Sequence, residues 1–456
     1  MSRFSYKDLK KIGRIENLTT EWEAVGVSTD SRSLVHGNLF FALSGGQRDG
    51  HDYVNEALQK GAAACVVSEV WYAQNKTKVP NGKFAIVHDS LLALQNLAKL
   101  HRQRSEASVI AITGTNGKTT AKEMTSAVLS KNFRTIATKG NLNNEIGVPL
   151  TLLNIENDTQ VAIIEMGADK KGDIAFLCNI AQPDSGVITN IGTAHIQSFG
   201  SIDAITETKC ELFDALSADG VRFVNIDDIR LRPYSKQTKG LVTFGFENAA
   251  DYRGEVISIN EQACAKLRIH APENHVFDVQ LNVPGVHLAN NALIAAAIGF
   301  SLGMDDHDII AALEDYKQPT NRVGIHRHNG ITVIDDTYNA NPESMRAAID
   351  TLTSIKRNGR AVAVLSDMLE LGALSGEEHA KVGAYAAEKK TDGLFVTGSE
   401  SKKIYENAKT IKDNFYFEKK NDLIPALKKF IKPGDTVLVK GSRGMKMEDV
   451  VTALVA

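Results

Sequence analysis

Apolar and polar positions along the chain follow a pattern that predicts alternating strands and helices. Val109 to Ile112 is a short β-rich apolar run, which indicates a buried strand. From Lys118 to Leu129 the chain has neither glycine nor proline, and apolar residues recur at helical spacing. A glycine-containing turn separates the two segments, so we predict the order strand, turn, helix.

Similar patterns flank this unit on both sides. A turn at 79–83, a strand at 84–87 and an amphipathic helix at 90–104 precede it. Three further strands are expected after it, at 134–138, 161–165 and 186–190. Helical patterns separate some of these strands, which is typical of a parallel sheet. Residues 241–287 change to short strand-like segments, which predicts an antiparallel annex.

The last third of the chain alternates most regularly. It follows an expected hinge at Lys317 to Thr320. Strands are predicted at 331–336, 361–365, 393–397 and 436–440, and helices at 343–355, 377–389, 401–410 and 421–431. This order predicts a doubly wound α/β domain. No G-x-G-x-x-G follows the first of these strands, so a dinucleotide site is not expected there.

Length and composition narrow the class of protein. A chain of 456 residues is expected to form two or three domains. A net charge of -3 gives no electrostatic reason to expect binding to nucleic acid or to an anionic membrane. The four cysteines are scattered, which favours a reducing, cytoplasmic setting. No apolar run indicates export or membrane insertion.

The turn between the first strand and helix reads AITGTNGKTT and nearly matches the phosphate-binding pattern G-x-x-x-x-G-K-[ST]. Gly117, Lys118 and Thr119 fit, but Ile112 occupies the place of the first glycine and Gly114 comes two residues later. In this context the backbone N–H groups would face an anion at the helix N-terminus. Lys118 would reach the terminal phosphates, and the Thr119 hydroxyl would bind Mg²⁺. The alternative is a surface turn that ends in a solvated lysine, and the flanking strand and helix favour the nucleotide site.

Two residues that follow later strands are candidate metal ligands. Glu165 ends the run VAIIE at the carboxyl end of a strand, where ligands of open α/β sheets bind. Its carboxylate suits Mg²⁺, which prefers oxygen ligands, but a helix-capping or solvated glutamate is the alternative. His195 lies in the loop NIGTAH after another strand, and a histidine without a ligand remains an equal alternative.

Lys209 lies on the apolar face of a predicted helix, four residues after Ile205 and three before Leu212. A lysine in this position commonly extends its ammonium group to water. Alternatively, burial makes the amine neutral enough to react with CO₂. The carbamate formed would be an anion able to bind Mg²⁺. The sequence leaves both alternatives open.

Longer motifs resemble a known family. GTNGKTT, KGNLNNEIGVPLTLL, EMG, NIGTAH and the helix with Lys209 resemble the central ATPase domain of the Mur ligases. STDSRSLVHGNLFF near the N-terminus, and VIDDTYNANPESM, VLSDMLELGALSGEEH and VLVKGSRGMKMEDVV in the last third, extend the resemblance over nearly the whole chain. It implies three domains: a small α/β UDP-sugar domain at 1–85, a central P-loop ATPase domain with a parallel sheet and an antiparallel annex at 86–317, and a C-terminal Rossmann-like domain at 318–456 that binds D-Ala-D-Ala.

The resemblance also implies an activity. The last third is similar to family members that join D-alanyl-D-alanine to UDP-N-acetylmuramoyl-tripeptide through an acyl phosphate, at the expense of ATP. The expected products are ADP, phosphate and the UDP-muramoyl-pentapeptide precursor of peptidoglycan. ATP and two Mg²⁺ ions are the implied cofactors. We expect a cytoplasmic monomer that acts on small molecules and neither binds nucleic acid nor inserts into a membrane.

The same resemblance implies roles for particular residues. The implied nucleotide contacts are Gly114, Thr115, Asn116, Gly117, Lys118, Thr119, Thr120, Asn291, Arg322 and Asp336. The implied metal ligands are Thr119, Glu165, His195 and a carbamylated Lys209, and with Lys118 the last three are the expected catalytic residues. The implied substrate contacts are Asp30, Ser31, Arg32, Asn144, Tyr338 and Asn339. Taken alone, Asp-Ser-Arg would indicate a turn with an Asx-type hydrogen bond. Asn321 departs from the glycine that many relatives have before the arginine, so the geometry of that loop is open.

Two other classes of enzyme share part of this pattern. A folylpolyglutamate synthase also has GTNGK but usually continues with Gly-Ser, where this chain has Thr119-Thr120. A P-loop kinase or regulatory ATPase would transfer or hydrolyse phosphate without forming an amide. The synthase is itself a ligase, whereas phosphate release with and without the two acceptor substrates distinguishes the kinase or ATPase from a ligase.

Overall fold

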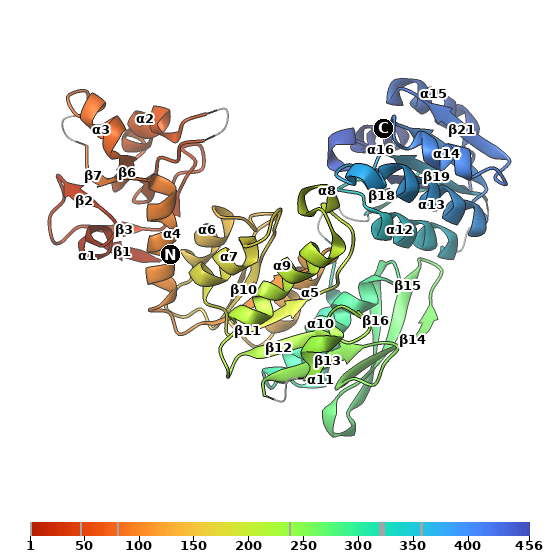
Figure 1. Cartoon of the computed structure of the whole chain (residues 1–456), viewed down its shortest axis with the longest axis horizontal. Helices are drawn as coiled ribbons and strands as arrows, with labels where there is room; N and C mark the ends of the chain where they lie inside the picture. Colours follow the sequence, from red (N-terminus) through yellow and green to blue (C-terminus); the bar gives the residue numbers. More distant parts are fainter. Residues whose placement is uncertain (1, 46–47, 80–81, 237–238, 319–323, 356–358) are drawn as a thin grey trace.

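The computed structural model describes residues 2–45, 48–79, 82–236, 239–318, 324–355 and 359–456. Three sheet-based domains follow one another from the N-terminus at one end of the molecule to the last domain at the other (Figure 1). Within the described ranges no helix has both the length and the apolar character needed to cross a membrane. The predicted fold class, with its three α/β domains, is confirmed.

The first domain is built on a five-stranded sheet of order β2-β7-β6-β5-β4. Only β2 runs antiparallel to its neighbour among these strands. The strands are β2 (Arg14–Glu16), β4 (Val27–Ser28), β5 (Leu39–Phe41), β6 (Ala64–Ser68) and β7 (Phe84–Val87), and a separate pair is β1 (Arg3–Ser5) with β3 (Glu23–Val25). The helices are α1 (Tyr6–Lys10), α2 (Val54–Gln59) and α3 (Glu69–Asn75). The strand predicted at 84–87 is present and pairs within this sheet.

The central domain carries a nine-stranded sheet of order β16-β15-β14-β13-β12-β11-β8-β10-β9. Its parallel part contains β8 (Ser108–Thr113), β9 (Thr135–Ala137), β10 (Val161–Glu165), β11 (Ser185–Ile188) and β12 (Val221–Asn225). The helices are α5 (Lys118–Leu129), α6 (Gly147–Leu152), α7 (Asp173–Ala181), α8 (Ile196–Phe199), α9 (Ile202–Ala215), α10 (Leu288–Ser301) and α11 (Asp306–Asp315). The strand–turn–helix unit predicted from the sequence is confirmed.

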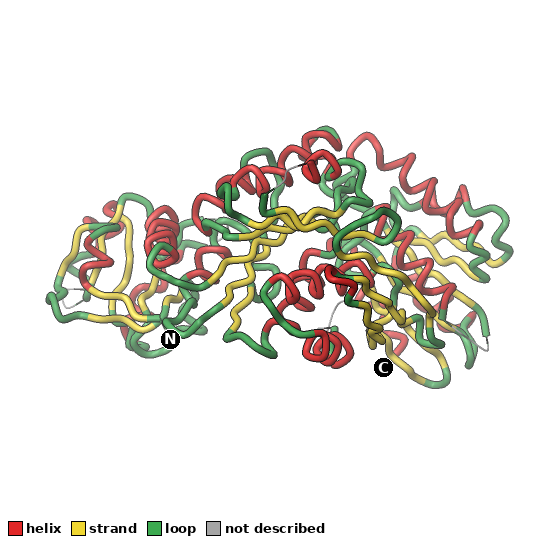
Figure 2. Tube along the Cα trace, turned by 90° about the horizontal axis from the view of Figure 1, so that it is seen from below, coloured by secondary structure: helices red, strands yellow, loops and turns green. Residues whose placement is uncertain are grey.

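Alternate residues of β8 explain why this part of the sheet has helices on both faces. Ile110 and Ile112 pack in a core that includes α5, α10 and α11, whereas Val109 and Ala111 pack with helices of the opposite layer. A strand buried on both faces appears in the sequence as a continuous apolar run. Figure 2 shows the strands lying between helices.

The predicted annex is continuous with the parallel sheet. Its strands are β13 (Leu241–Gly245), β14 (Tyr252–Ile259), β15 (Cys264–His270) and β16 (Val276–Pro284). The pairs β14–β15 and β15–β16 are antiparallel, as predicted. β13 instead pairs parallel to β12 on one side and to β14 on the other. The expectation of antiparallel strands was therefore wrong for β13, which extends the parallel part of the sheet instead of forming a hairpin with β14.

The helix α4 (Ser90–Arg102) joins the first two domains. It begins after Asp89, whose carboxylate accepts hydrogen bonds from the N–H groups of Leu91 and Leu92. It packs against α6 and α7 of the central domain and makes smaller contacts with β5 and β6. At its end, the Arg102 guanidinium donates to Asp184 Oδ2 over 2.8 Å and to three backbone carbonyls. The amphipathic helix predicted here therefore serves as a packed connector.

The last domain has a six-stranded sheet of order β17-β18-β22-β19-β20-β21. The strands are β17 (Gly324–His328), β18 (Ile331–Asp336), β19 (Ala361–Ser366), β20 (Gly393–Thr397), β21 (Asp413–Phe417) and β22 (Thr436–Lys440). The helices are α12 (Pro342–Ser354), α13 (Ser375–Glu388), α14 (Lys402–Asn407), α15 (Lys420–Phe430) and α16 (Glu448–Val455). All strands but β17 are parallel to their neighbours, so the predicted doubly wound domain is confirmed.

Two details of this domain differ from the prediction. The helix predicted at 401–410 ends at Asn407, and β21 follows it although no strand was predicted there. β21 is only half-buried at the sheet edge, which weakens its apolar signal. Of the predicted hinge, Lys317 and Gln318 are described, whereas Thr320 lies outside the described residues.

Candidate active site

The loop between β8 and α5 needs glycine at two positions. Gly114 has φ 143° and Gly117 has φ 79°, both in the range that favours glycine. A Cβ atom at Gly114 would lie 2.0 Å from Thr189 Oγ1, and one at Gly117 would lie 2.6 Å from Asn291 Oδ1. Gly114 lies two residues beyond the usual place of the first glycine in the phosphate-binding pattern. It therefore permits close packing against the loop after β11.

Side chains after β11 hold this phosphate loop in place. The Thr189 hydroxyl donates to the carbonyl of Asn116 over 2.6 Å, and the N–H of Asn116 donates to Asn190 Oδ1 over 2.9 Å. The N–H of Thr115 donates to the carbonyl of Asn190 over 2.9 Å. The loop is thus ordered by its neighbours, which favours preorganised anion binding at the N-terminus of α5.

Lys118 is the first residue of α5, and its side chain turns back over the loop. Its Nζ donates to the carbonyls of Gly114, over 2.8 Å, and Thr115, over 3.0 Å. A phosphate group bound in the loop could take the place of these carbonyls as the acceptor. The lysine is therefore close to where a terminal phosphate would bind.

A cavity of about 1270 Å³ opens beside this loop and extends to the last domain. Fifteen of the residues predicted from the sequence line it: Gly114, Thr115, Asn116, Gly117, Lys118, Thr119, Thr120, Asn144, Glu165, His195, Lys209, Asn291, Asp336, Tyr338 and Asn339. Asp30, Ser31 and Arg32 do not line it and lie in the first domain. Arg322 lies outside the described residues.

Glu165 is almost completely buried at the carboxyl end of β10, next to β8. Its Oε1 accepts a hydrogen bond from Asn143 Nδ2 over 2.8 Å, and its N–H donates to Thr138 Oγ1 over 3.0 Å. Within the described part of the chain its Oε2 is buried without a hydrogen-bond partner. A buried carboxylate oxygen without a donor is costly, and a cation would satisfy it.

His195 has φ 59° and immediately precedes α8. Its Nδ1 lies 2.5 Å from Glu370 Oε2 of the last domain. A carboxylate on one ring nitrogen orients the ring and leaves the second nitrogen as a potential metal donor. The contact joins two domains at the cavity.

Lys209, on α9, is only 4% exposed. Burial, together with the positive charge of Lys118, lowers the pKa of its ammonium group to about 7. At neutral pH a substantial share of the side chain is therefore the neutral amine, the form that reacts with CO₂. The ammonium does not extend to bulk water, so the snorkelling alternative does not describe this lysine.

In the first domain, Asp30 forms the local turn that its sequence suggested. Its Oδ1 accepts from the N–H of Arg32 over 2.9 Å, and its carboxylate pairs with the Arg32 guanidinium. These hydrogen bonds lower the pKa of Asp30 to about 2. The guanidinium is exposed on the surface, with its donors directed at Asp30.

Several cavity residues were not predicted from the sequence. Lys440 ends the buried strand β22, and its Nζ lies 2.7 Å from Asp336 Oδ2 and donates to the carbonyl of Asn339 over 2.8 Å. Glu343, on α12, accepts hydrogen bonds through Oε1 from the N–H and hydroxyl of Thr193. Lys440 could have been found from the sequence, because it is a charged residue at the end of an apolar strand, the same pattern that identified Glu165. Glu343 is a contact between domains, which local patterns do not indicate.

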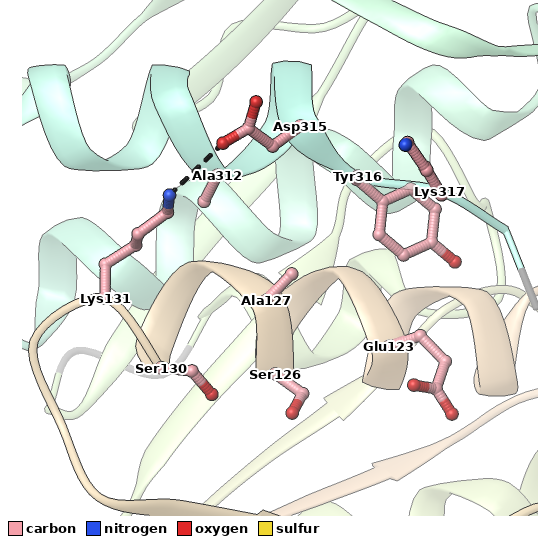
Figure 3. A pocket seen from close by; sticks show the side chains of 9 residues that line it. All are labelled: Glu123, Ser126, Ala127, Ser130, Lys131, Ala312, Asp315, Tyr316 and Lys317. Atoms are coloured by element: carbon pink, nitrogen blue, oxygen red, sulfur yellow. Dashed lines mark hydrogen bonds and ion pairs between the residues drawn. The ribbon is translucent and has the colours of Figure 1, made fainter.

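Two other features lie apart from this cavity. A smaller groove of about 360 Å³ runs between α5 and α11. Lys131 Nζ and Asp315 Oδ2 lie 3.3 Å apart. Figure 3 shows this pair across the groove. Among the described residues, Asp305, His307 and Asp308 are spaced as a metal site would require. Asp305 caps α11 by accepting from the N–H of Asp308, which accounts for its position.

Comparison with known families matches the three domains in order. Residues 23–102 match the description "Mur ligase family, catalytic domain", 112–299 match "Mur ligase middle domain", and 321–443 match "Mur ligase, glutamate ligase domain".

Proteins that match nearly the whole length of the chain are ligases of the same family. The chain is 38% identical over 436 residues to the UDP-N-acetylmuramoyl-tripeptide--D-alanyl-D-alanine ligase of Bacillus subtilis (strain 168), covering 94% of this chain and 93% of that protein. It is 37% identical over 434 residues to the ligase of the same name from Escherichia coli (strain K12), covering 94% and 93%.

Solved structures are similar over the same length. A crystal structure of MurF from Acinetobacter baumannii matches with a TM-score of 0.89 and 32% identity, covering 100% of this chain and 99% of the other. MurF ligase from Thermotoga maritima in complex with ADP matches with a TM-score of 0.81 and 29% identity, covering 94% and 96%.

Proposed function

The chain belongs to the Mur ligase family, and on that premise we propose that it joins D-alanyl-D-alanine to UDP-N-acetylmuramoyl-tripeptide with the use of ATP. The product is the UDP-muramoyl-pentapeptide precursor of peptidoglycan, released with ADP and phosphate. Relatives that carry this activity in their names match almost the full length of the chain. The observation that carries the proposal is the preorganised phosphate loop, with Lys118 and Glu165 in one cavity that reaches the last domain.

The reaction has two steps. A carboxylate oxygen of the tripeptide attacks the γ-phosphorus of ATP, the bond to the β-phosphate oxygen breaks, and ADP leaves. The amine of D-alanyl-D-alanine then attacks the acyl carbon, phosphate leaves, and a proton is released from the attacking nitrogen. In such a transfer the protein mainly positions the reactants and neutralises charge.

The phosphate loop provides the positioning. Its backbone N–H groups at the N-terminus of α5 receive the phosphates, and the bonds from Thr189 and Asn190 keep it in that conformation. Lys118 exchanges its two loop carbonyls for phosphate oxygens. Its positive charge then balances charge that develops on the transferred group.

The residues present fit Mg²⁺. The buried, unpartnered Oε2 of Glu165 offers a hard oxygen ligand in the cavity that Thr119 also lines. Thr119 and Glu165 would hold one ion, and His195 with a carbamylated Lys209 would hold a second. A bound ion supplies charge neutralisation for the phosphates. The lowered pKa of Lys209 supports the carbamate, because the neutral amine is its precursor.

The remaining contacts belong to the same proposal. Asn291 and Asp336 contact the nucleotide, together with Arg322, which lies outside the described residues. Asp30, Ser31 and Arg32 contact the UDP moiety in a domain of residues 1–85, far from the reacting groups. Asn144, Tyr338 and Asn339 contact the substrates that meet between a domain of 86–317 and one of 318–456. Four buried, unpaired cysteines support a reducing cytoplasmic setting, and we include a monomeric state in the proposal.

Phosphate release tests this function. The protein is incubated with MgATP alone, with each acceptor singly, and with UDP-N-acetylmuramoyl-tripeptide and D-alanyl-D-alanine together. A ligase releases phosphate in quantity only with both, in step with pentapeptide formation. Release with MgATP alone, at the same rate and without amide, would indicate a P-loop ATPase. Turnover with a folate and glutamate would indicate a folylpolyglutamate synthase.

A further inference from the structure

Lys122 is a completely buried lysine one turn beyond Lys118 on α5. A buried ammonium group is costly unless its charge and its hydrogen-bond donors are satisfied. Neither the phosphate-binding pattern nor the reaction described above gives this residue a role. Its surroundings show what compensates the charge.

Two backbone carbonyls and two carboxylates surround the ammonium group. Lys122 Nζ donates to the carbonyl of Thr138 over 2.5 Å and to that of Gly140 over 3.4 Å. It pairs with Glu123 Oε1 over 2.9 Å. Its distance to Glu165 Oε2 is 3.7 Å, which is within the range of an ion pair but too long for a hydrogen bond.

This spacing has a consequence for Glu165. The positive charge of Lys122 offsets the negative charge of the buried carboxylate. At the same time the two carbonyls hold Nζ back, so that Oε2 keeps its lone pairs. Within the described residues that oxygen accordingly has no hydrogen-bond partner. Direct donation from Lys122 would have satisfied Oε2 and competed with a cation.

The segment that Lys122 holds also orients the carboxylate. Thr138 Oγ1 accepts from the N–H of Glu165 over 3.0 Å. Farther along, Asn143 Nδ2 donates to Glu165 Oε1 over 2.8 Å. The carbonyl of Asn143 accepts from the N–H of Gly167. Lys122 is therefore connected to Glu165 both through space and through the segment 138–143.

We propose that Lys122 is a positioning residue that compensates the charge of the Glu165 carboxylate and keeps it oriented and open at Oε2 for the magnesium ion of MgATP. This inference rests on the nucleotide site proposed above. Lys122 touches neither nucleotide nor substrate in this role. It acts through Glu165 and through the carbonyls of Thr138 and Gly140.

The test compares Lys122→Met with the wild-type protein by calorimetric titration of ADP, with excess Mg²⁺ and with a chelator. Methionine has a similar length but no charge. We expect the metal-free ADP affinity to change less than about twofold and the gain in affinity from Mg²⁺ to fall by about tenfold or more. Lys99→Met is the matched control, because Lys99 is only partly buried and contacts Asn179 on α7, and it should leave both values unchanged. An unchanged magnesium effect in Lys122→Met would overturn the proposal.

A second measurement needs no nucleotide and remains informative if Lys122→Met folds poorly. The loss of melting temperature in Lys122→Met should shrink in the background Glu165→Gln, because a neutral side chain there needs no compensating charge. If Lys122→Met does not fold, the double variant should recover folding. Additive losses, or no recovery, would refute the charge role. Failure of the wild-type protein itself to bind MgADP would instead count against the proposed function.

Discussion

Asn341 Nδ2 donates a hydrogen bond to Asn116 Oδ1 over 2.7 Å, which links the last domain directly to the phosphate loop. The same side chain caps α12, since its Oδ1 accepts from the N–H of Ser344 over 2.9 Å. One residue therefore couples the start of a helix in one domain to the nucleotide site of another.

The two roles of Asn341 can be separated by substitution. Serine is as good an N-cap as asparagine but is too short to reach Asn116. Loss of one hydrogen bond of about 1 kcal/mol predicts that the KM for ATP in Asn341→Ser rises about fivefold, with little change in melting temperature. Asn341→Ala should show the same rise in KM and a further loss of about 1 kcal/mol in stability. An unaltered KM in both variants would show that this bond does not couple the domains.

Lys118→Ala and Glu165→Ala should each reduce ligation at least about a hundredfold, because each removes a charged group that neutralises or binds the reacting phosphates. The fold should survive in both, since Lys118 donates to carbonyls of its own loop, and Lys122 keeps Glu123 as a charged partner when Glu165 is removed. Pentapeptide formation and circular dichroism measure the two effects. Near-normal turnover in either variant would contradict the site assignment.

Glu370 should affect the Mg²⁺ concentration that ligation requires, because it orients His195. Its Oε2 lies 2.5 Å from His195 Nδ1, so Glu370→Ala frees the ring to rotate. We expect the Mg²⁺ concentration needed for half-maximal ligation to rise about tenfold, while Glu370→Gln, which keeps a hydrogen-bonding group, rises less. A magnesium curve that superimposes on that of the wild-type protein would exclude this orienting role.

The lowered pKa of Lys209 predicts a pH dependence of stability. Its pKa is about 7 in the folded protein and 10.5 in the reference state, so the unfolded chain binds more protons between these values. The free energy of unfolding should therefore rise with pH from about 7 to 10, by up to about 1.4 kcal/mol for each pH unit relative to Lys209→Met. Chemical denaturation of both proteins at several pH values measures the difference. Parallel curves would mean that the ammonium is not destabilised by burial.

The same amine should take up CO₂. After incubation with ¹³C-labelled bicarbonate above pH 7, the wild-type protein should show a carbamate carbon resonance that Lys209→Met lacks. A resonance of equal strength in Lys209→Met would assign the carbamate to another lysine. Absence of a resonance in both proteins would contradict the carbamate, and His195 would then be without this partner as a metal ligand.

Most of the fold could be predicted because its signals are local. The buried strands β8 and β10 appear as short apolar runs, and α5 has helical spacing with no breaker. The direction of β13 could not be predicted, because parallel and antiparallel pairing depend on how the chain crosses the sheet and not on the strand's own residues. β21 was missed because a half-buried edge strand carries a weak apolar pattern.

The candidate site divides in the same way. The phosphate loop, Glu165, His195 and Lys209 follow strands or a helix face that the sequence marks, and the structure brings them to one cavity. The burial of Lys122 could not be predicted from the sequence of α5. It depends on hydrogen bonds to the carbonyls of residues 138 and 140, which belong to another segment. Bonds between domains, such as that of Asn341, connect residues far apart in the chain and have no local signal.

The central claim is that ATP phosphorylates the carboxylate of the tripeptide before the amide forms. It is tested most directly with UDP-N-acetylmuramoyl-tripeptide labelled with ¹⁸O in that carboxylate, ligated to D-alanyl-D-alanine with unlabelled ATP. Mass spectrometry of the released phosphate should show one ¹⁸O atom for each pentapeptide formed, because the oxygen that attacks phosphorus leaves with it. Phosphate without ¹⁸O, formed together with pentapeptide, would contradict the account.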